Sequence, residues 1–286
     1  MVPHAEARRD LPASTLRQSL LARASGHHSS FVGAQPMNRT VIAISYNRSM
    51  QEATRKTLGA LMGAGAKLVQ QTGSADVSLA RNQALTMALR VLASLNRERL
   101  NTKPPLDQLP EWAAPPLFDT VLMIDDDIAC TVDQAQELVT HARETGVPAS
   151  AMYSTINAAL AGTRLFTPPG ERSRWVVGLG LLAIPAAVLV KLAKASVHFD
   201  LHGEEQVEFT WSGTIRGKWH SEDYTFCRRL GGVHLLPIPV AHMKTIPLYP
   251  HADSVACIKE GRRLPGELDS TQLEHLTDAE LTEPTR

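Results

Sequence analysis

The sequence has few cysteines and no long apolar run. Its three cysteines, Cys130, Cys227 and Cys257, are far apart and odd in number, which fits neither a disulfide framework nor a zinc site with closely spaced ligand pairs. The richest apolar stretch, 176–192, is interrupted by two glycines and a proline, and no run approaches the roughly 18 residues of a membrane-spanning helix. We therefore expect a cytoplasmic protein without stable membrane insertion.

Neither sign of charge is in excess, because 29 basic residues balance 29 acidic ones. The chain therefore lacks the overall positive field that would attract nucleic acid or an anionic membrane surface. With 286 residues, of which 43% are hydrophobic, it is long enough for one large α/β domain or two small ones with a substantial core. Any partner must be recognised by local groups.

The two ends of the chain are polar. Residues 1–38 contain four arginines and many small polar residues but lack the apolar core of a secretory signal, and Glu6 and Asp10 count against an organellar transit peptide. We interpret 1–38 as a disordered extension, 39–260 as a single catalytic domain, and 261–286 as a flexible tail that becomes acidic towards its end.

Short apolar runs and amphipathic stretches alternate in the first half of the domain. Strands are expected at 40–44, 67–70 and 120–124, and helices at 50–61, 78–95 and from Thr131 to Gly146. Thr131 and Gln134 form a capping-box pattern, and Gly146 before Pro148 is a stop signal. This alternation predicts an α/β fold with a mostly parallel central sheet flanked by helices, in which ligands bind beyond the carboxyl ends of the strands.

The second half is less regular. A proline-rich excursion at 96–116 separates it from the second helix. Beyond the third helix we expect a short strand at 149–154, a strand at 175–184, a helix entered through Pro185, a short helix opening at 219–223, and a last strand at 233–240 that leads to His242.

Three adjacent carboxylates, Asp125, Asp126 and Asp127, follow the clearest predicted strand. Such neighbours repel one another unless a cation or hydrogen bonds compensate them. A solvated turn or a helix cap is the alternative explanation, but Thr131 already supplies the cap. Mg²⁺ or Mn²⁺ prefers oxygen ligands and completes its coordination shell with substrate phosphates, so the triplet predicts a divalent-cation site.

The segment Ile124-Asp125-Asp126-Asp127 resembles the Asp-x-Asp motif of GT-A glycosyltransferases, in particular the inverting family-2-like group that includes phage-encoded members. The resemblance spans roughly 40–250. It implies a Rossmann-like GT-A fold, a nucleotide-diphosphate sugar as donor, most often a UDP-sugar, and Mn²⁺ or Mg²⁺ bridging the diphosphate. In this comparison Asp125 and Asp127 bind the metal, and Asp125 and Asp126 contact the nucleotide.

Three further segments are similar to donor-site motifs of that family. Ser45-Tyr46-Asn47, at the end of the first strand, corresponds to the position that packs against the nucleotide base, and Arg81-Asn82 corresponds to a segment near the nucleotide. An arginine in the first turn of a helix opposes the helix dipole unless an anion shares the site. Gly178 and Gly180 lie in a segment resembling the strand that approaches the transferred sugar; a strand glycine is also commonly a bulge.

Glu222-Asp223 resembles the acidic pair that opens a helix in inverting members, where one carboxylate accepts the proton of the attacking hydroxyl. The resemblance implies that Asp223, or less favourably Glu222, is the base, although acidic residues also cap helices. His242 matches the histidine that many members supply to the metal. His251, His220 and His234 are its competitors.

The combined prediction is a metal-dependent hexosyltransferase that inverts the anomeric carbon. The alternatives are a nucleotidyltransferase acting on a sugar phosphate, which would usually carry a glycine- and lysine-rich phosphate loop after the first strand, and a non-catalytic nucleotide-sugar-binding module. The acceptor is open: a protein, a glycan, a small molecule or a modified DNA base. Basic residues that could contact DNA are Arg164, Arg172, Arg174, Arg216 and Lys218.

Overall fold

The computed structural model describes residues 37–46, 50–72, 76–96, 118–154, 164–166, 174–215, 217–243, 247–248, 255–256 and 259–260. All of these lie in one compact unit, 35–286. The expected tail 261–286, the proline-rich excursion beyond Asn96, and all of the expected extension except its last two residues lie outside the described residues. No helix of the described part is long and apolar enough to cross a membrane.

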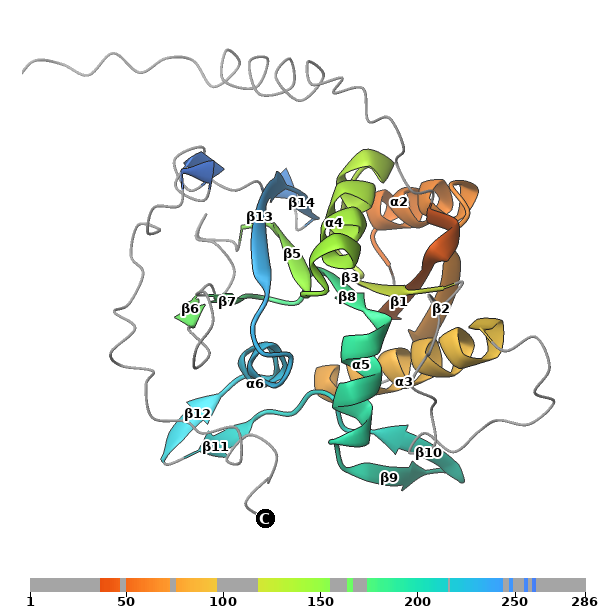
Figure 1. Ribbon diagram of the computed structural model, residues 1–286, viewed down its shortest axis with the longest axis vertical. Helices are drawn as coiled ribbons and strands as arrows, with labels where there is room; N and C mark the ends of the chain where they lie inside the picture. Colours follow the sequence, from red (N-terminus) through yellow and green to blue (C-terminus); the bar gives the residue numbers. More distant parts are fainter. Residues whose placement is uncertain are drawn as a thin grey trace, which may run out of the picture. The chain divides into compact units, whose positions relative to one another are not determined.

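A six-stranded sheet forms the centre of the fold (Figure 1). Its strands, in spatial order, are β13 (His234–Pro239), β5 (Ala149–Met152), β8 (Leu181–Pro185), β3 (Thr120–Asp125), β1 (Thr40–Tyr46) and β2 (Lys67–Thr72). Neighbours pair in parallel except at β8, which runs antiparallel to both β3 and β5. The mostly parallel sheet is confirmed, and the reversed strand begins at the edge where its neighbours end.

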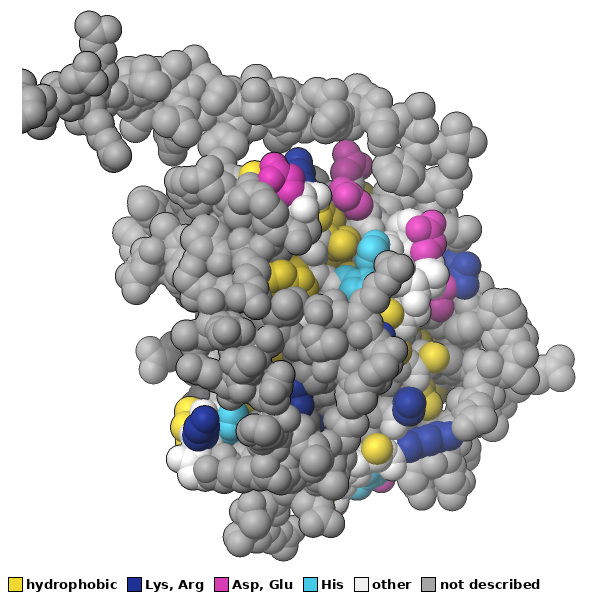
Figure 2. Space-filling view, turned by 60° about the vertical axis from the view of Figure 1, so that its left-hand side comes forward, with side chains coloured by type: hydrophobic (Ala, Val, Ile, Leu, Met, Phe, Trp, Pro, Cys, Tyr) yellow, Lys and Arg dark blue, Asp and Glu magenta, His cyan; other side chains and the backbone are white. Residues whose placement is uncertain are grey.

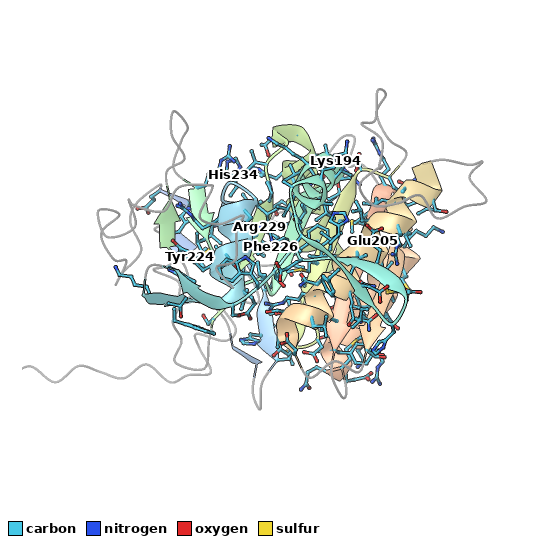
Figure 3. All side chains as sticks on the ribbon, turned by 90° about the horizontal axis from the view of Figure 1, so that it is seen from below. Lys194, Glu205, Tyr224, Phe226, Arg229 and His234 are labelled. Carbon is cyan, nitrogen blue, oxygen red and sulfur yellow. The ribbon has the colours of Figure 1, made fainter. Side chains whose placement is uncertain are left out.

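Helices cover both faces of this sheet. They are α2 (Glu52–Gly63), α3 (Val77–Asn96), α4 (Val132–Thr145), α5 (Ala186–Lys194) and α6 (Glu222–Arg229). Successive residues of β1 point to opposite faces: Val41 packs in a first core with side chains of α3, α5 and α6, and Ile42 packs in a second core with α2 and α4. Phe226 of α6 is fully buried in the first core (Figure 3). Burial on both faces explains why the inner strands β1 and β3 are nearly continuous apolar runs.

The predicted boundaries of α4 are confirmed in detail. The Thr131 hydroxyl accepts a hydrogen bond from the Gln134 amide (3.2 Å), and the Gln134 side chain accepts one from the Thr131 amide (2.9 Å). Gly146 ends the helix with a φ of 66°, a left-handed conformation that glycine adopts without strain.

The expectation of one strand over 175–184 is wrong. The chain forms β7 (Arg174–Val176), which pairs with β6 (Arg164–Phe166), and then leaves that pairing for the central sheet as β8. Residues 177–180 connect the two strands and contain both glycines of the predicted strand. Residues 177–180 are apolar because this connecting segment is buried, and the spacing of apolar residues cannot distinguish such a segment from a strand.

Two hairpins escaped prediction because their strands are short. They are β9 (His198–Leu201) with β10 (Glu204–Val207), and β11 (Gly213–Ile215) with β12 (Lys218–His220). Consequently residues 218–220 belong to a strand, and α6 begins later than expected, at Glu222. A small separate sheet joins β15 (Pro247–Leu248), β14 (Ala241–Met243) and β4 (Ile128–Ala129).

Polar side chains tie the amino ends of β1 and β3 to the end of α4. Arg143 donates hydrogen bonds from Nε to Asp119 Oδ1 (2.6 Å) and from Nη2 to the Thr40 hydroxyl (3.0 Å). Arg39 forms an ion pair with the other oxygen of Asp119. We refer to Arg39, Asp119 and Arg143 as the basal cluster.

Candidate functional site

Predicted site residues from several parts of the chain meet at the carboxyl edge of the sheet. Ser45 and Asp125 occupy paired positions at the ends of β1 and β3. Tyr46 follows Ser45 and packs, partly buried, against the second core. Asn47 lies outside the described residues. The first strand therefore ends beside the aspartate triplet, as expected for a parallel sheet.

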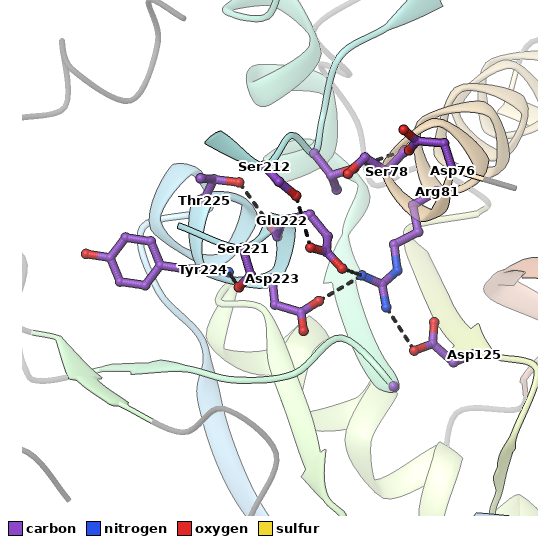
Figure 4. A network of polar contacts seen from close by, with 12 residues as sticks. Asp76, Ser78, Arg81, Asp125, Ser212, Ser221, Glu222, Asp223, Tyr224 and Thr225 are labelled. Carbon is purple, nitrogen blue, oxygen red and sulfur yellow. Dashed lines mark hydrogen bonds and ion pairs between the residues drawn. The ribbon is translucent and has the colours of Figure 1, made fainter. Parts of the chain in front are cut away.

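Arg81 joins three carboxylates at this edge. Its guanidinium donates from Nη1 to Asp223 Oδ1 (2.8 Å) and Glu222 Oε1 (3.2 Å), and from Nη2 to Asp125 Oδ2 (2.9 Å) (Figure 4). Only 6% of Arg81 is exposed. The side chain thus links α3, β3 and α6, and it brings Asp125 of the acidic triplet and the Glu222-Asp223 pair into one cluster.

The charge of this cluster is unbalanced. One guanidinium faces three carboxylates, and burial strengthens each of these interactions. Burial alone would lower the pKa of Arg81, but Asp125, Asp223 and Glu222 outweigh it and raise that pKa above its ordinary value. The cluster therefore keeps a surplus of negative charge, which suits a site that binds a cation or takes up a proton.

Asp223 is the carboxylate whose protonation is most altered. Burial, reinforced by the charges of Glu222 and Asp125 and opposed by Arg81, raises the pKa of Asp223 from 3.8 to about 6. Its side chain remains 32% exposed. A carboxylate with a pKa this close to neutrality can accept a proton from a hydroxyl group at physiological pH.

Glu222 is held more tightly than Asp223. Its Oε1 accepts from Arg81 and its Oε2 accepts from the Ser212 hydroxyl (3.1 Å). Within the described part of the chain, Asp223 Oδ2 has no hydrogen-bond partner. The Ser221 hydroxyl caps α6 by accepting from the Tyr224 amide (3.4 Å), so neither acidic residue is needed as the cap.

Asp127 and His242 form a second group at the same edge. His242 Nε2 lies 3.2 Å from Asp127 Oδ2, and His242 Nδ1 lies 2.7 Å from the Ser154 carbonyl oxygen. A carbonyl only accepts, so Nδ1 carries a proton; in the neutral ring, Nε2 then presents a lone pair to the carboxylate. Two acceptors that face each other suit a cation between or beside them, and a histidine oriented through a carbonyl is typical of metal ligands.

This donor set is incomplete by itself. Among the described residues, no group of three or more His, Cys, Asp or Glu side chains is close enough to hold a metal ion. A cation on Asp127 and His242 would therefore take further ligands from Asp125, water or a bound phosphate, as Mg²⁺ and Mn²⁺ commonly do. The backbone carbonyl of Asp126 accepts a hydrogen bond from the Gln51 amide (3.0 Å).

The competing histidines lie elsewhere. His220 is buried and stacks on Tyr224, with ring centroids 4.5 Å apart. His234 begins β13, at the amino edge of the sheet, and shares a 2.9 Å contact between ring nitrogens with His141. His251 lies outside the described residues. His242 is therefore the one of these that the described structure places beside the triplet.

Asn82 supports the site through hydrogen bonds to the backbone of Thr210. Its Nδ2 donates to the Thr210 carbonyl (2.9 Å), and its Oδ1 accepts from the Thr210 amide (2.7 Å). With 4% exposure, the amide is buried and uses its oxygen and one of its two N–H groups to bind Thr210. It fixes the segment that leads to Ser212 and hence to Glu222.

Gly180 is required by a neighbouring tyrosine. Its amide donates to the Tyr153 hydroxyl (2.9 Å), and its carbonyl accepts from the Asp125 amide (2.9 Å). A Cβ at position 180 would lie 2.7 Å from Tyr153 Cζ, so only glycine fits. Gly178 is buried in the same segment. The close approach expected at these glycines occurs at Gly180, and the neighbouring group is the ring of Tyr153.

Sequence analysis did not identify Tyr153, although it directly follows β5 at the carboxyl edge. Its ring packs edge-on to His242, with centroids 5.4 Å apart. Burial, together with the negative charges of Asp125 and Asp223, raises the pKa of Tyr153 well above its ordinary value. Its position near the end of the strand expected at 149–154 was the one available signal.

The described basic side chains form no single large patch on the face shown in Figure 2. Of the residues considered for DNA contact, Arg174 donates to the Gly231 carbonyl (3.1 Å), and Lys218 is exposed on β12. Arg172, Arg216 and the side chain of Arg164 lie outside the described part of the molecule.

No protein-family model matches the chain, and no curated protein matches it. Among solved structures, the crystal structure of A197 from STIV superposes on 72% of this chain and 86% of its own, with 16% sequence identity and a TM-score of 0.45. A likeness this distant carries no functional conclusion.

Proposed function

We propose that the chain is a metal-dependent glycosyltransferase of the GT-A type, which transfers a sugar from a nucleotide-diphosphate sugar to a hydroxyl acceptor with inversion. The observation that carries this proposal is the bridge made by Arg81 between Asp125 and the Glu222-Asp223 pair. Inverting transfer needs a diphosphate site on one side of the sugar and a base on the other. The bridge is compatible with both lying at one edge of the sheet.

Asp127 and His242 would hold the divalent cation, with Asp125 as a further ligand from the triplet. When bound, the cation would neutralise the negative charge that develops on the leaving diphosphate. Arg81 adds a positive charge to the same edge and holds Asp125 against α6. These interactions act where charge develops, which is where electrostatic catalysis has its largest effect.

Asp223 is the proposed base. Its Oδ2 accepts the proton of the acceptor hydroxyl, and the hydroxyl oxygen forms a bond to the anomeric carbon. The bond between that carbon and the diphosphate oxygen breaks at the same time, and its electron pair leaves with the nucleoside diphosphate. Asp223 is favoured over Glu222 because both oxygens of Glu222 are already hydrogen-bonded.

The test is a thermal-shift and hydrolysis screen with UDP-glucose, UDP-galactose, UDP-N-acetylglucosamine and GDP-mannose, each with and without Mn²⁺. We expect Mn²⁺-dependent stabilisation by at least one of them in the wild type and its loss in Asp127→Ala. The matched control is Asp133→Ala, which removes an exposed aspartate from the first turn of α4 and should leave the response unchanged.

Three outcomes would contradict the proposal. A folded protein that responds to no nucleotide sugar is not a glycosyltransferase acting on these donors. Release of pyrophosphate from a nucleoside triphosphate and a sugar phosphate would identify a nucleotidyltransferase. Metal-dependent binding of a donor, with neither hydrolysis nor transfer to a broad set of hydroxyl acceptors, would identify a binding module.

A further inference from the structure

Tyr153 lies between the two groups of the candidate site. On one side its ring packs edge-on to His242. On the other side its hydroxyl accepts from the amide of Gly180, whose carbonyl in turn accepts from the amide of Asp125. The phenol oxygen is thus separated from the backbone of Asp125 by a single residue.

Within the described residues, the Tyr153 hydroxyl accepts a hydrogen bond but donates none. A tyrosine hydroxyl can accept and can donate, and Gly180 uses the accepting side. Among the described residues, no acceptor is within hydrogen-bond distance of the phenolic hydrogen. Tyr153 is 8% exposed. A buried donor without a partner costs free energy, which a ligand oxygen at this point would recover.

The surroundings indicate which part of a ligand would supply that oxygen. In the proposed reaction, the transferred sugar lies between the diphosphate, near Asp125 and Asp127, and the base Asp223. The phenol is held one residue from Asp125, and the charge of Asp223 also acts on it. In the proposed reaction this position, near both Asp125 and Asp223, is beside the place of the transferred sugar.

We infer that the Tyr153 hydroxyl donates a hydrogen bond to a hydroxyl group of the transferred sugar and so selects donors that carry that hydroxyl. This inference rests on the proposed function. A donor lacking the hydroxyl would leave the phenolic hydrogen buried and unpaired. Sites that hydrogen-bond a substrate hydroxyl discriminate strongly against analogues without it.

The experiment compares Tyr153→Phe with the wild type in binding to nucleotide sugars and to the corresponding nucleoside diphosphates. The probes are UDP-glucose, UDP-galactose, UDP-N-acetylglucosamine and GDP-mannose, with UDP and GDP, all with Mn²⁺ and measured by calorimetry. We expect about tenfold or greater loss of affinity for the bound nucleotide sugar. Affinity for the nucleoside diphosphate should stay unchanged, because it makes no contact with the phenol.

Tyr224→Phe is the matched control. Tyr224 is also buried, but its ring points away from Arg81 (Figure 4) and stacks on His220. This variant should bind both ligands as the wild type does. Thermal unfolding of all three proteins shows whether Tyr153→Phe remains folded after Gly180 loses its acceptor.

A second measurement does not depend on the folding of any variant. The wild type is tested with the monodeoxy analogues of the nucleotide sugar that it binds. We expect one deoxy position to lose about tenfold or more in affinity while the others lose little. In folded Tyr153→Phe the penalty at that position should disappear.

The outcomes separate the two hypotheses. If the wild type binds none of the nucleotide sugars, the proposed function and this inference both fail. If it binds one, and Tyr153→Phe weakens sugar nucleotide and diphosphate equally or neither, only the inference fails. Equal affinity of the wild type for all monodeoxy analogues also overturns the inference.

Discussion

Two arginines, Arg81 buried and Arg143 partly buried, lie at opposite ends of the central strands and differ in their partners. At the amino edge, Arg143 and Arg39 share a single carboxylate, Asp119, whose two oxygens are both bound by guanidinium groups. At the carboxyl edge, the single guanidinium of Arg81 is shared by three carboxylates. One end of the strands thus has guanidinium groups in surplus, and the other has carboxylates in surplus.

The difference separates a structural cluster from the proposed site. Among the described residues, the basal cluster binds both oxygens of Asp119, which stabilises the folded state without leaving a carboxylate oxygen of Asp119 for chemistry. At the other end, burial, reinforced by the charges of Glu222 and Asp125, raises the pKa of Asp223 to about 6, which is unfavourable for folding but useful for proton transfer.

The largest expected effect is the loss of transfer in Asp223→Asn. An amide cannot accept the acceptor proton, so the transfer rate should fall about 10³-fold, within the usual range for a general base. Initial-rate measurements with saturating donor test this. The comparison variant, Asp119→Asn, should lower stability but keep the activity of each folded molecule. Full activity in Asp223→Asn would remove this residue from the mechanism.

Arg81→Gln should reduce transfer about 10²-fold and also change its pH dependence. In the wild type, activity should decline as the pH falls through about 6, because Asp223 becomes protonated. Arg81 lowers the pKa of Asp223, so its removal raises that pKa and moves the acidic limb to higher pH. A pH–rate profile measures the shift. An unmoved limb in Arg81→Gln would contradict the coupling, and Arg143→Gln should leave it in place.

Arg143→Gln should destabilise the protein by about 3 kcal/mol, because Asp119 loses one of its two guanidinium partners and the Thr40 hydroxyl loses a donor. Urea unfolding gives this value directly. The activity of the folded fraction should be unchanged. A stability equal to that of the wild type would show that Arg39 alone satisfies Asp119.

The smallest expected effect is on the pH dependence of stability. The pKa of Asp223 is raised on folding, so the folded state binds the proton more tightly than the unfolded state. Ionised Asp223 therefore destabilises the fold above about pH 6, and this penalty disappears as the pH falls towards 4. Asp223→Asn should unfold at a higher temperature than the wild type at pH 7.5, with no such advantage at pH 4.

Sequence patterns predicted the elements that depend on local signals. The apolar runs of β1, β2 and β3 and the capping box of α4 needed no knowledge of distant contacts. The reversed direction of β8 was not predicted, because that direction depends on pairing with β3 and β5 and not on the composition of β8 itself. The short hairpins carry too few residues for a clear alternation.

The site was predictable as a set of residues but not as a network. Arg81 was identified from the resemblance of its segment to a family motif and from its helix position, yet its bonds to Asp125 and Asp223 span 44 and 142 residues of sequence. Tyr153 could not be assigned a role from the sequence, because its hydroxyl contacts the amide of Gly180, which belongs to a separate segment of the chain. Residue types and order are local information, whereas shared charge and burial arise only on folding.

The reversed strand β8 also affects how such a protein can diversify. Its register is fixed by five residue pairs with β3, from Leu181 to Pro185, while the chain just before it passes the site. Val177 and Leu179 in this stretch are buried in the first core, so substitutions there are limited by packing as well as by the site. Gly180 is restricted further, because the Tyr153 ring leaves no room for a side chain there.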